Sequence, residues 1–335
     1  MTSIKEVADA LGVSSATVSR TMRGMPGVSV EVRARVREMA TKLNYSASPN
    51  ASSLATGRTL TIGVVTPYIA RWYFAQLVAN VESVLSEAGY DLLLYDIASD
   101  AARARFFQRM PVRKRVDAII SFLLPDDDEA RALRSVGVPL ALVGARKEGF
   151  ASFSIDDVSS AETAVRHLIN LGHTRIGLIG GGGDPVPMQF VTPTDRRTGY
   201  LRALETSGID YDPRLEENGE YTATGGERAM NSLLAASNRP TAVFAQSDEM
   251  AIGAMRAIRR HGLRVADDVS LIGFDNHEMA EMVGLTTVSQ PLPLLGKAVA
   301  TSVLEQLAHP GVEVPPHVEL PTRLIVRETT GPLKP

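Results

Sequence analysis

The stretch IKEVADALGVSSATVSRTMRG, residues 4–24, contains two short helical patterns separated by a glycine. The first pattern opens with Ser3 and Glu6, which have the spacing of a capping box, and its apolar residues recur at helical intervals up to Gly12. Ser14 is suited to cap the second pattern, which ends at another glycine. We therefore predict two short helices joined by a tight turn.

A third helical pattern follows closely along the chain. Ser29 has the position of an N-cap, and apolar residues at Val32, Val36 and Met39 are spaced to pack back on the first two helices. On the second helix, Val18 is expected to face the same small core. The three helices together make a unit of about 45 residues, which is marginal in size for independent stability.

Charge is distributed unevenly along the chain. The net charge is −3, but residues 1–58 hold 8 basic and 4 acidic side chains, and the remainder holds 27 basic and 34 acidic ones. The N-terminal piece therefore carries +4 and the rest carries −7. Only the small helical head has the charge expected of a unit that binds a polyanion.

Composition sets limits on the rest of the protein. With 335 residues, 44% of them hydrophobic and 22% charged, the chain is typical of a soluble globular protein of two or three domains. No apolar run approaches the roughly 20 residues that span a bilayer. The N-terminal MTSIKEVADA carries acids where a signal peptide carries an apolar core, so we expect a cytoplasmic protein. The absence of cysteine excludes disulfides, thiolate metal sites and cysteine nucleophiles.

The segment SASPNASSLATGR, residues 46–58, has the small, polar composition of a linker. Ser48 nevertheless fits an N-cap, Pro49 fits the first position of a helix, and Gly57 fits the position after one. A helix this short does not persist alone in water. We therefore expect a hinge helix over about residues 49–56 that orders only when something packs against it.

From Thr61 onward, apolar strand-like runs alternate with amphipathic helical segments. The strand-like runs are TIGVVTP, DLLLYDI, DAIISFLL, PLALVGA, RIGLIGG, TAVFAQS and VSLIGFD. This alternation predicts parallel sheets covered by helices on both faces. About 275 residues suit two doubly wound lobes that face a cleft. The order of the strands is not determined by the sequence.

Taken in order, these segments resemble the LacI family of transcription regulators. Residues 4–24 match the family's helix-turn-helix signature almost position for position, and SPNASSLATGR continues the match through the hinge. The segments that resemble the family's sensor domain are GYDLLLYDI, HLINLGHTRIGLIGG, DRRTGYLRAL, SDEMAIGAMRAIRRHGLRVADDVSLIGFDN and LTTVSQPLPLLGKAVA. The resemblance covers nearly the whole chain.

The resemblance implies a small all-α helix-turn-helix head and an α/β sensor. Residues 1–57 would form the DNA-binding head with its hinge helix, and residues 60–335 the domain that binds an effector and dimerises. The sensor would be periplasmic-binding-protein-like, with two doubly wound parallel-sheet lobes: an N-lobe of about residues 60–160 plus 293–320 and a C-lobe of about residues 161–292 plus 321–330.

Carried over by position, the second helix enters the major groove of DNA. The residues implied to contact DNA are Ser14, Ser15, Ala16, Thr17, Ser19, Arg20, Asn50 and Leu54. Arg20 is the strongest candidate for base recognition, because arginine donates two parallel hydrogen bonds to guanine N7 and O6. Leu54 resembles the family's leucine that wedges into the minor groove and bends the duplex. The alternatives are an ordinary solvated helix face and a leucine that packs against the sensor.

The resemblance also implies a cleft that binds a polar small molecule. The implied contacts are Tyr73, Phe74, Thr192, Arg196, Tyr221, Ser247, Asp275 and Leu292. Arg196 offers a planar donor fork, Asp275 accepts hydrogen bonds from hydroxyls or amines, and aromatic rings stack on a sugar or base. Alternatively, Tyr73 and Phe74 belong to the core and Asp275 caps a helix that begins near His277.

The class of ligand stays open at this point. Phe190 stands where the purine-responsive branch of the family has an arginine, whereas Tyr73 and Phe74 resemble that branch. We expect a sugar or sugar derivative ahead of a purine, because the implied set is rich in partners for hydroxyl groups. Asp156, in the strand end SIDD, is a further acid whose reach to the ligand the sequence does not decide.

Other chemistry finds no support in the sequence. GGGGD at residues 180–184 lacks the features of a phosphate loop, and Pro185 and Pro187 interrupt the helix that should follow it, so we interpret it as a loop at the cleft rim. The six histidines lack metal-ligand spacing, and no GxSxG elbow or HExxH helix occurs. We expect no cofactor, no metal and no enzymatic activity.

Two rival functions share parts of this pattern. A sugar-binding transport protein has the same two-lobed build, but the basic head and the missing signal peptide argue against it. A sugar kinase or dehydrogenase would need a phosphate loop or a dinucleotide fingerprint. We expect instead a homodimer on a near-palindromic, double-stranded operator, because one head supplies a single short reading helix. The terminal ETTGPLKP lacks the leucine heptad that family tetramers append, and the resemblance makes repression the default outcome.

Overall fold

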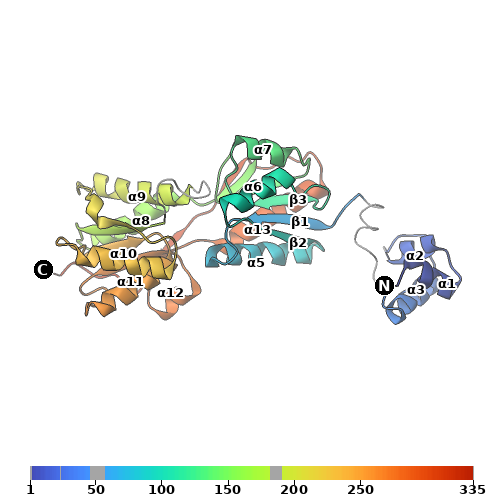
Figure 1. Cartoon of the computed structure of the whole chain (residues 1–335), viewed down its shortest axis with the longest axis horizontal. Coiled ribbons are helices and arrows are strands. Elements are labelled where there is room, and N and C mark those ends of the chain that lie inside the picture. Colours follow the sequence, from blue (N-terminus) through green and yellow to red (C-terminus); the bar gives the residue numbers. More distant parts are fainter. Residues whose placement is uncertain (1, 23, 46–56, 182–190, 335) are drawn as a thin grey trace. The chain divides into compact units, whose positions relative to one another are not determined.

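The computed structural model describes residues 2–22, 24–45, 57–181 and 191–334. The chain forms two compact units, Met1–Leu60 and Thr61–Pro335 (Figure 1). We call the first unit the head.

The head contains the three short helices that the sequence predicts: α1 (Ile4–Leu11), α2 (Ser15–Met22) and α3 (Val30–Lys42). The capping box of α1 is confirmed, since the Ser3 hydroxyl accepts from the Glu6 N–H and the Glu6 carboxylate accepts from the Ser3 N–H. Gly12 follows α1 with a φ of 65°, a conformation that glycine adopts without strain. These local signals fix where the first helix begins and ends.

The head's core is small and apolar. Val7, Val18 and Val36 come from the three different helices and are all fully buried. The partly buried residues around them are Ile4, Leu11, Val13, Met22, Val32, Met39, Leu43 and Tyr45. The predicted inward positions are therefore confirmed, and the opposite sides of the helices are left for solvent or a partner.

The second unit is built from two sheets, each six-stranded within the described residues. The first sheet contains β1 (Thr61–Thr66), β2 (Asp91–Asp96), β3 (Ala118–Ser121), β4 (Leu140–Val143), β5 (Ala151–Ser154) and β11 (His317–Glu319). The second contains β6 (Ile176–Gly180), β7 (Glu216–Asn218), β8 (Ala242–Ala245), β9 (Ser270–Asp275), β10 (Thr286–Ser289) and β12 (Arg323–Ile325). We call the sheets, with the helices that cover them, the N-lobe and the C-lobe.

The two sheets repeat one topology. The strand order is β11-β5-β4-β3-β1-β2 in the N-lobe and β12-β10-β9-β8-β6-β7 in the C-lobe. All pairings are parallel except that of β12 with β10, which is antiparallel. The prediction of two doubly wound, parallel-sheet lobes is confirmed, with this one edge strand as a departure.

Helices cover both faces of each sheet (Figure 1). In the N-lobe, α5 (Trp72–Glu87) and α13 (Leu292–Ala308) pack on one face, and α6 (Asp100–Arg109) and α7 (Asp127–Arg134) on the other. In the C-lobe, α8 (Asp157–Asn170) and α9 (Thr192–Thr206) lie opposite α10 (Ala223–Ala235) and α11 (Asp248–Arg260), and α12 (Glu278–Met282) follows β9. A 3-10 turn, Pro213–Leu215, precedes β7.

The seven strands predicted from apolar runs are all present, but the sequence analysis missed five others. Three of them, β7, β11 and β12, have only three residues each and lie at sheet edges, where no long apolar run is needed. The β5 and β10 strands are buried but rich in serine and threonine. None of the helices in the described part of the chain is both long and apolar enough to cross a membrane.

Candidate functional site

The exposed side of α2 carries the residues that the sequence analysis assigned to DNA. Val18 and Thr21 face the core, whereas Ser15, Ala16 and Arg20 are exposed. This division follows from helical spacing, since residues three and four apart share a face. Arg20 is therefore able to reach a neighbouring surface without disturbing the core.

The N-terminal turn of α2 is organised by Ser14. Its hydroxyl accepts a hydrogen bond from the Thr17 N–H at 3.1 Å and lies 2.9 Å from the Thr17 hydroxyl. Ser14 is exposed, and Thr17 and Ser19 are half-exposed. Small side chains at this end let the helix backbone approach a ligand closely, and the N–H groups of a helix N-terminus favour an anion such as phosphate.

The loop after α2 is held by α3. The Arg33 guanidinium donates to the carbonyl of Val28 at 3.1 Å and to that of Met25. The Ser29 hydroxyl accepts from the Val32 N–H and caps α3, as predicted. We call the exposed side of α2, with Ser15, Ala16 and Arg20, its reading face. The contacts of Arg33 hold the loop that follows this helix. Asn50 and Leu54, the two hinge residues assigned to DNA, lie outside the described residues, and their roles stay predictions.

The second unit contains a cavity of about 510 Å³. It is lined from both lobes by Tyr68, Arg71, Tyr73, Phe74, Gly144, Ser154, Ile155, Asp157, Gly181, Thr192, Pro193, Arg196, Asn218, Glu220, Tyr221, Ser247, Glu249, Asp275 and Gln290. Most of these residues stand at or just after the carboxyl ends of parallel strands, where open α/β sheets bind ligands. The volume suits a small molecule of one or two rings.

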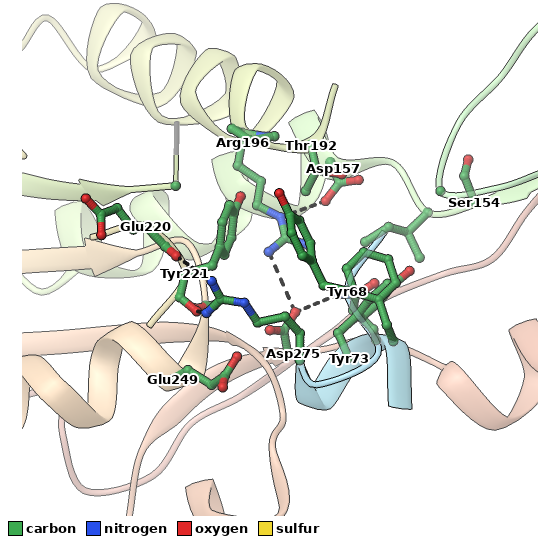
Figure 2. A pocket seen from close by; sticks show the side chains of 18 of the residues that line it. Tyr68, Tyr73, Ser154, Asp157, Thr192, Arg196, Glu220, Tyr221, Glu249 and Asp275 are labelled. Carbon is green, nitrogen blue, oxygen red and sulfur yellow. Dashed lines mark hydrogen bonds and ion pairs between the residues drawn. The ribbon is translucent and has the colours of Figure 1, made fainter. Parts of the chain in front are cut away.

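Arg196 is the central charge of the cavity (Figure 2). It projects from α9, and its Nε donates to Asp157 Oδ1 at 2.7 Å while Nη1 lies 3.6 Å from Asp275 Oδ1. Its guanidinium also stacks 3.6 Å above the ring centre of Phe274. Arg196 is only 4% exposed, so these partners, rather than water, compensate its charge.

Asp275 is the second buried charge. Its Oδ1 accepts a hydrogen bond from Gln290 Nε2 at 2.6 Å. Burial raises the pKa of Asp275 to about 7, although Arg196 and Gln290 act in the lowering direction. Burial likewise raises the pKa of Asp157 against the lowering effect of Arg196. Burial therefore favours the neutral form of both carboxyls, and the neighbouring Arg196 opposes this by favouring the ionised form.

Aromatic rings form two walls of the cavity. Tyr73 packs edge-on against Phe74, with ring centres 5.1 Å apart, and Phe74 stacks on Phe122 of the N-lobe core. From the C-lobe, the Tyr221 hydroxyl donates to Gln246 Oε1 at 3.2 Å. Burial raises the pKa of Tyr73 and of Tyr221 well above the ordinary value, so both hydroxyls stay protonated. Rings on both sides suit a flat ligand or the face of a sugar.

The loop before the cavity makes room for Tyr221. A Cβ added to Gly181 would lie 1.7 Å from a Tyr221 ring carbon, so only glycine fits there. Gly181 N–H also donates to Gln246 Oε1 at 3.1 Å. The glycine run that the sequence analysis placed at a cleft rim therefore contributes Gly181 to the wall, and residues 182–190, including Phe190, lie outside the described residues.

Direct contacts join the two lobes beside the cavity. Arg71, in the loop before α5, donates to the carbonyl oxygens of Glu220, at 3.1 Å, and Tyr221. The Trp72 ring packs against the His277 ring with centres 4.6 Å apart. Both Glu220 and Tyr221 have positive φ angles, 54° and 51°, which turn their carbonyls sharply. In this structure the two lobes are therefore in direct contact beside the cavity.

Comparison with known proteins agrees with this arrangement. Residues 3–50 match the family model described as bacterial regulatory proteins, lacI family, and residues 165–330 match a periplasmic binding protein-like domain. The chain is 32% identical to the HTH-type transcriptional repressor CytR of Escherichia coli K12 over 310 residues, 91% of this chain and 89% of CytR. It is 33% identical to the HTH-type transcriptional repressor PurR of Escherichia coli O1:K1 over 343 residues, 100% of this chain and 99% of PurR.

The chain belongs to the LacI family of bacterial regulatory proteins. Solved structures of this family superpose along the whole chain. The lac repressor dimer bound to operator and the anti-inducer ONPF matches with a TM-score of 0.86 and 29% identity, covering 98% of this chain and 99% of that one. The regulator CelR in complex with cellobiose matches with a TM-score of 0.71 and 31% identity, covering 98% and 100%. The protein is accordingly a DNA-binding transcriptional repressor controlled by an effector.

Seven of the eight effector contacts implied by the LacI-family resemblance line the cavity: Tyr73, Phe74, Thr192, Arg196, Tyr221, Ser247 and Asp275. Ser247 also caps α11 by accepting from the Met250 N–H, so its hydroxyl is already committed. Leu292 does not line the cavity, because it is buried at the start of α13, and Gln290, two residues earlier, lies there instead. Whether these residues bind an effector stays a prediction.

The structure bears on the alternatives raised for Tyr73, Phe74 and Asp275. Tyr73 and Phe74 belong both to the N-lobe core and to the cavity wall. Asp275 does not cap α12, since the His277 side chain accepts from the Met279 N–H. Asp156 caps α8 by accepting from the Ser159 N–H, and its neighbour Asp157 reaches the cavity.

Sequence reasoning missed several wall residues. The charged or polar ones are Tyr68, Arg71, Ser154, Asp157, Asn218, Glu220, Glu249 and Gln290. Asp157 and Glu249 lie in the first turns of α8 and α11, the helices that follow β5 and β8, which is a usable signal once the strand order is known. Asn218 is the last residue of β7 and Glu220 lies just after it, and no apolar run in the sequence predicts this edge strand.

Proposed function

We propose that this repressor works as a homodimer on a near-palindromic operator in the cytoplasm, without enzymatic activity, and that its effector is a sugar or sugar derivative held in the cavity. Arg20 and the small residues at the start of α2 would read the operator. Tyr73, Arg196, Tyr221 and Asp275 would hold the effector.

The main support for a sugar is that the cavity wall contains more carboxyl groups, which accept hydrogen bonds, than guanidinium groups, which donate them. Four carboxyl groups line it, from Asp157, Glu220, Glu249 and Asp275, but only two guanidiniums, from Arg71 and Arg196. Glu220 also pairs with Arg228, which does not line the cavity. Carboxylate oxygens accept hydrogen bonds, which is what the many hydroxyls of a sugar offer. The aromatic walls supply apolar faces for the ring. CelR, a relative of similar fold, is known in complex with cellobiose.

The excess of carboxylates also argues against anionic effectors. A phosphate or carboxylate group would meet the guanidinium of Arg196 already paired with Asp157 at 2.7 Å and close to Asp275. Displacing these pairs would leave buried carboxylates without a partner, which is strongly unfavourable. We therefore favour neutral sugars over sugar phosphates and sugar acids.

A purine is the second candidate, because Tyr73 and Tyr221 face the cavity from opposite lobes and aromatic rings stack well on a base. The two candidates differ in how many carboxyl oxygens they would use as hydrogen-bond acceptors, because a sugar has many hydroxyl donors and a base has few donors.

Exposed apolar side chains support a homodimer. On α12, Met279 and Met282 are 39% and 78% exposed. At the edge of the N-lobe sheet, Leu92 and Leu94 of β2 are only half-buried. Exposed apolar side chains are candidates for contact with a second copy of the chain, and a two-fold dimer would double a single reading helix. A stable monomer at micromolar concentration that still binds operator tightly would refute the dimer.

Effector control would run through the angle between the lobes. The chain passes between the sheets at three places, after β5, after β10 and after β11. A ligand that binds both lobes favours one angle, and the angle would set whether residues 50–56 form helices together on DNA. A coupling free energy of about 1–3 kcal/mol, typical of such systems, would suffice because so short a helix is marginal.

The test combines ligand titration with DNA binding. Calorimetry would compare ribose, cellobiose, ribose 5-phosphate, cytidine and hypoxanthine, and a mobility shift on the promoter fragment would follow each of them. Binding of a neutral sugar with a change in operator affinity supports the proposal. Binding of hypoxanthine alone favours the purine candidate, and binding of ribose 5-phosphate ahead of ribose contradicts the charge argument.

A further inference from the structure

The second unit carries an unusual basic segment in the N-lobe. Residues 105–115, RFFQRMPVRKR, contain five cations and no acid, although the chain beyond residue 58 carries a net charge of −7. The five are Arg105, Arg109, Arg113, Lys114 and Arg115, and all are exposed. We call this segment, which comprises the second half of α6 and the loop after it, the basic loop. This local positive charge is opposite in sign to the net charge of the rest of the second unit.

The basic loop is not neutralised by its surroundings. In the described part of the chain, none of its five cations forms an ion pair, whereas nearby Arg103 pairs with Glu129 at 2.5 Å. Arg113 donates to the Ser135 hydroxyl, which is uncharged. Asp91 and Asp117 lie at the same end of the sheet, but they are two acids beside five cations. The loop therefore presents a positive field to solvent.

The loop has a fixed shape. Met110 ends α6 with a φ of 43°, and Lys114 has a φ of 58°, a conformation that non-glycine residues adopt only when the surroundings impose it. The backbone N–H of Arg113 donates to Met110, and that of Arg115 donates to Val112. Val112 and Val116 are buried in the N-lobe core, so the loop is anchored from below. Lys114 and Arg115 are thus held outward by the fold.

The loop lies where the chain arrives from the head. The Asp117 N–H, two residues after Arg115, donates to the Thr61 carbonyl at 2.8 Å, and Ile62 pairs with Ala118 in the sheet. Thr61 is the first residue of β1 and follows the segment that connects to the DNA-binding head. The chain that leads from the head therefore enters the N-lobe at the same end of the sheet as the basic loop.

From these observations we infer that the basic loop binds the phosphate backbone of the operator DNA, as a second contact made by the sensor domain itself. Exposed cations read phosphate and not sequence, so the contact adds affinity for any duplex held by the heads. The inference rests on the DNA-binding function of the family and goes beyond it by assigning a DNA contact outside the head.

The test measures salt dependence with charge-removing variants of the full chain. Lys114→Gln/Arg115→Gln is compared with wild type and with the control Arg239→Gln/Arg259→Gln, two exposed C-lobe cations that also lack an ion pair in the described residues. Binding to the operator fragment and to an unrelated duplex of equal length is followed by fluorescence anisotropy from about 50 to 200 mM salt, where neutralised phosphates change the affinity steeply.

We expect the loop variant to bind both duplexes more weakly and to lower the slope of log affinity against log salt by about 0.9 for each phosphate that it no longer neutralises. The ratio of operator to unrelated binding stays the same, and the control keeps the wild-type slope. In addition, ethylated phosphates that hinder wild type without hindering the loop variant would mark the contact on the DNA.

Three results would overturn the inference: a wild-type slope in the loop variant, an equal fall in the control, or an identical ethylation pattern. If the double variant loses its thermal transition, Arg109→Gln at the end of α6 gives the same test. Failure of wild type to bind either duplex at the lowest salt would contradict the DNA-binding function itself, and is thus distinct from failure of the basic loop.

Discussion

The reading face of α2 and the wall of the cavity differ in how their residues are held. On α2, Ser15, Ala16 and Arg20 are exposed, and helical spacing alone separates them from the core. In the cavity, Arg196 and Asp275 are only 4% and 8% exposed. Arg196 pairs with Asp157, and Asp275 accepts a hydrogen bond from Gln290. Side chains of the first kind act through what they touch in a partner, whereas those of the second kind also hold the fold together.

This difference changes what a substitution can report. Removing an exposed side chain leaves the rest of the molecule intact, so its effect on binding is direct. Removing a buried charge leaves its partner without compensation, so stability falls together with binding. Stability and binding should therefore change together in the cavity and separately on α2.

The largest effect is expected from Arg196→Ala. Asp157 and Asp275 would both lose their cation inside a buried site, and we expect the free energy of unfolding to fall by about 3–5 kcal/mol. The matched control is Arg197→Ala on the same helix, whose ion pair with Glu216 at 2.6 Å is only partly buried, so we expect a smaller loss of stability. Urea unfolding of both variants measures the difference. Equal losses would show that burial of Arg196 does not set its role.

Arg20→Ala should act on recognition without acting on stability. We expect operator affinity to fall by about 1–3 kcal/mol for each half-site, with relaxed preference at one base pair, because alanine cannot make the bidentate hydrogen bonds to guanine. Binding to operators changed at each base pair in turn measures this, with Lys42→Ala on α3 as the exposed control. A uniform loss over all operator variants would mark Arg20 as a phosphate contact instead.

Effector binding should depend on pH through Asp275. Its pKa of about 7 means that the carboxyl is mostly protonated below pH 7 and mostly ionised above it. Hydroxyl donors of a ligand favour the ionised form, so affinity should rise as pH increases through 7, by up to about tenfold per unit, or 1.4 kcal/mol, below the pKa. Three charged groups also act on this pKa: Arg196 lowers it, and Asp157 and Glu249 raise it.

Calorimetry between pH 6 and 8, a window of about one unit on either side of that pKa, measures the dependence with the neutral sugar that binds best. Asp275→Asn should flatten the profile. A falling affinity with rising pH would show that the ligand donates no hydrogen bond to this carboxylate.

The parts predicted from the sequence are those that local chemistry decides. The caps at Ser3 and Ser29 and the inward positions of Val18 and Val36 depend on residues within one or two turns. The long apolar strands are likewise visible one at a time. These signals sufficed for the head, the two parallel sheets and the family resemblance.

The parts that were missed depend on partners far apart in the sequence. Asp157 matters because Arg196, on another helix, lies 2.7 Å away, and Gln290 matters because Asp275 accepts its hydrogen bond. Neither residue has a distinctive local pattern. Leu292 was implied by the LacI-family resemblance, but it is buried at the start of α13 and does not reach the cavity. Strand order would have been needed to place these residues together.

The smallest effect is expected for Arg71, which lies in the cavity wall and is neither fully buried nor fully exposed. Arg71 is half-buried and holds the lobes together through the carbonyls of Glu220 and Tyr221. Arg71→Ala should lower the population of the closed cleft and weaken sugar binding several-fold, about 1 kcal/mol, because apparent affinity scales with the population of the binding-competent state. The matched control is Arg134→Ala, whose guanidinium donates to the Glu148 carbonyl at 2.8 Å within one lobe. Sugar titration by calorimetry, together with the radius of gyration from X-ray scattering, measures both variants. A wild-type sugar affinity in Arg71→Ala, or an equal loss in Arg134→Ala, would mean that the contact between the lobes does not govern closure, and that the cavity residues alone set the angle.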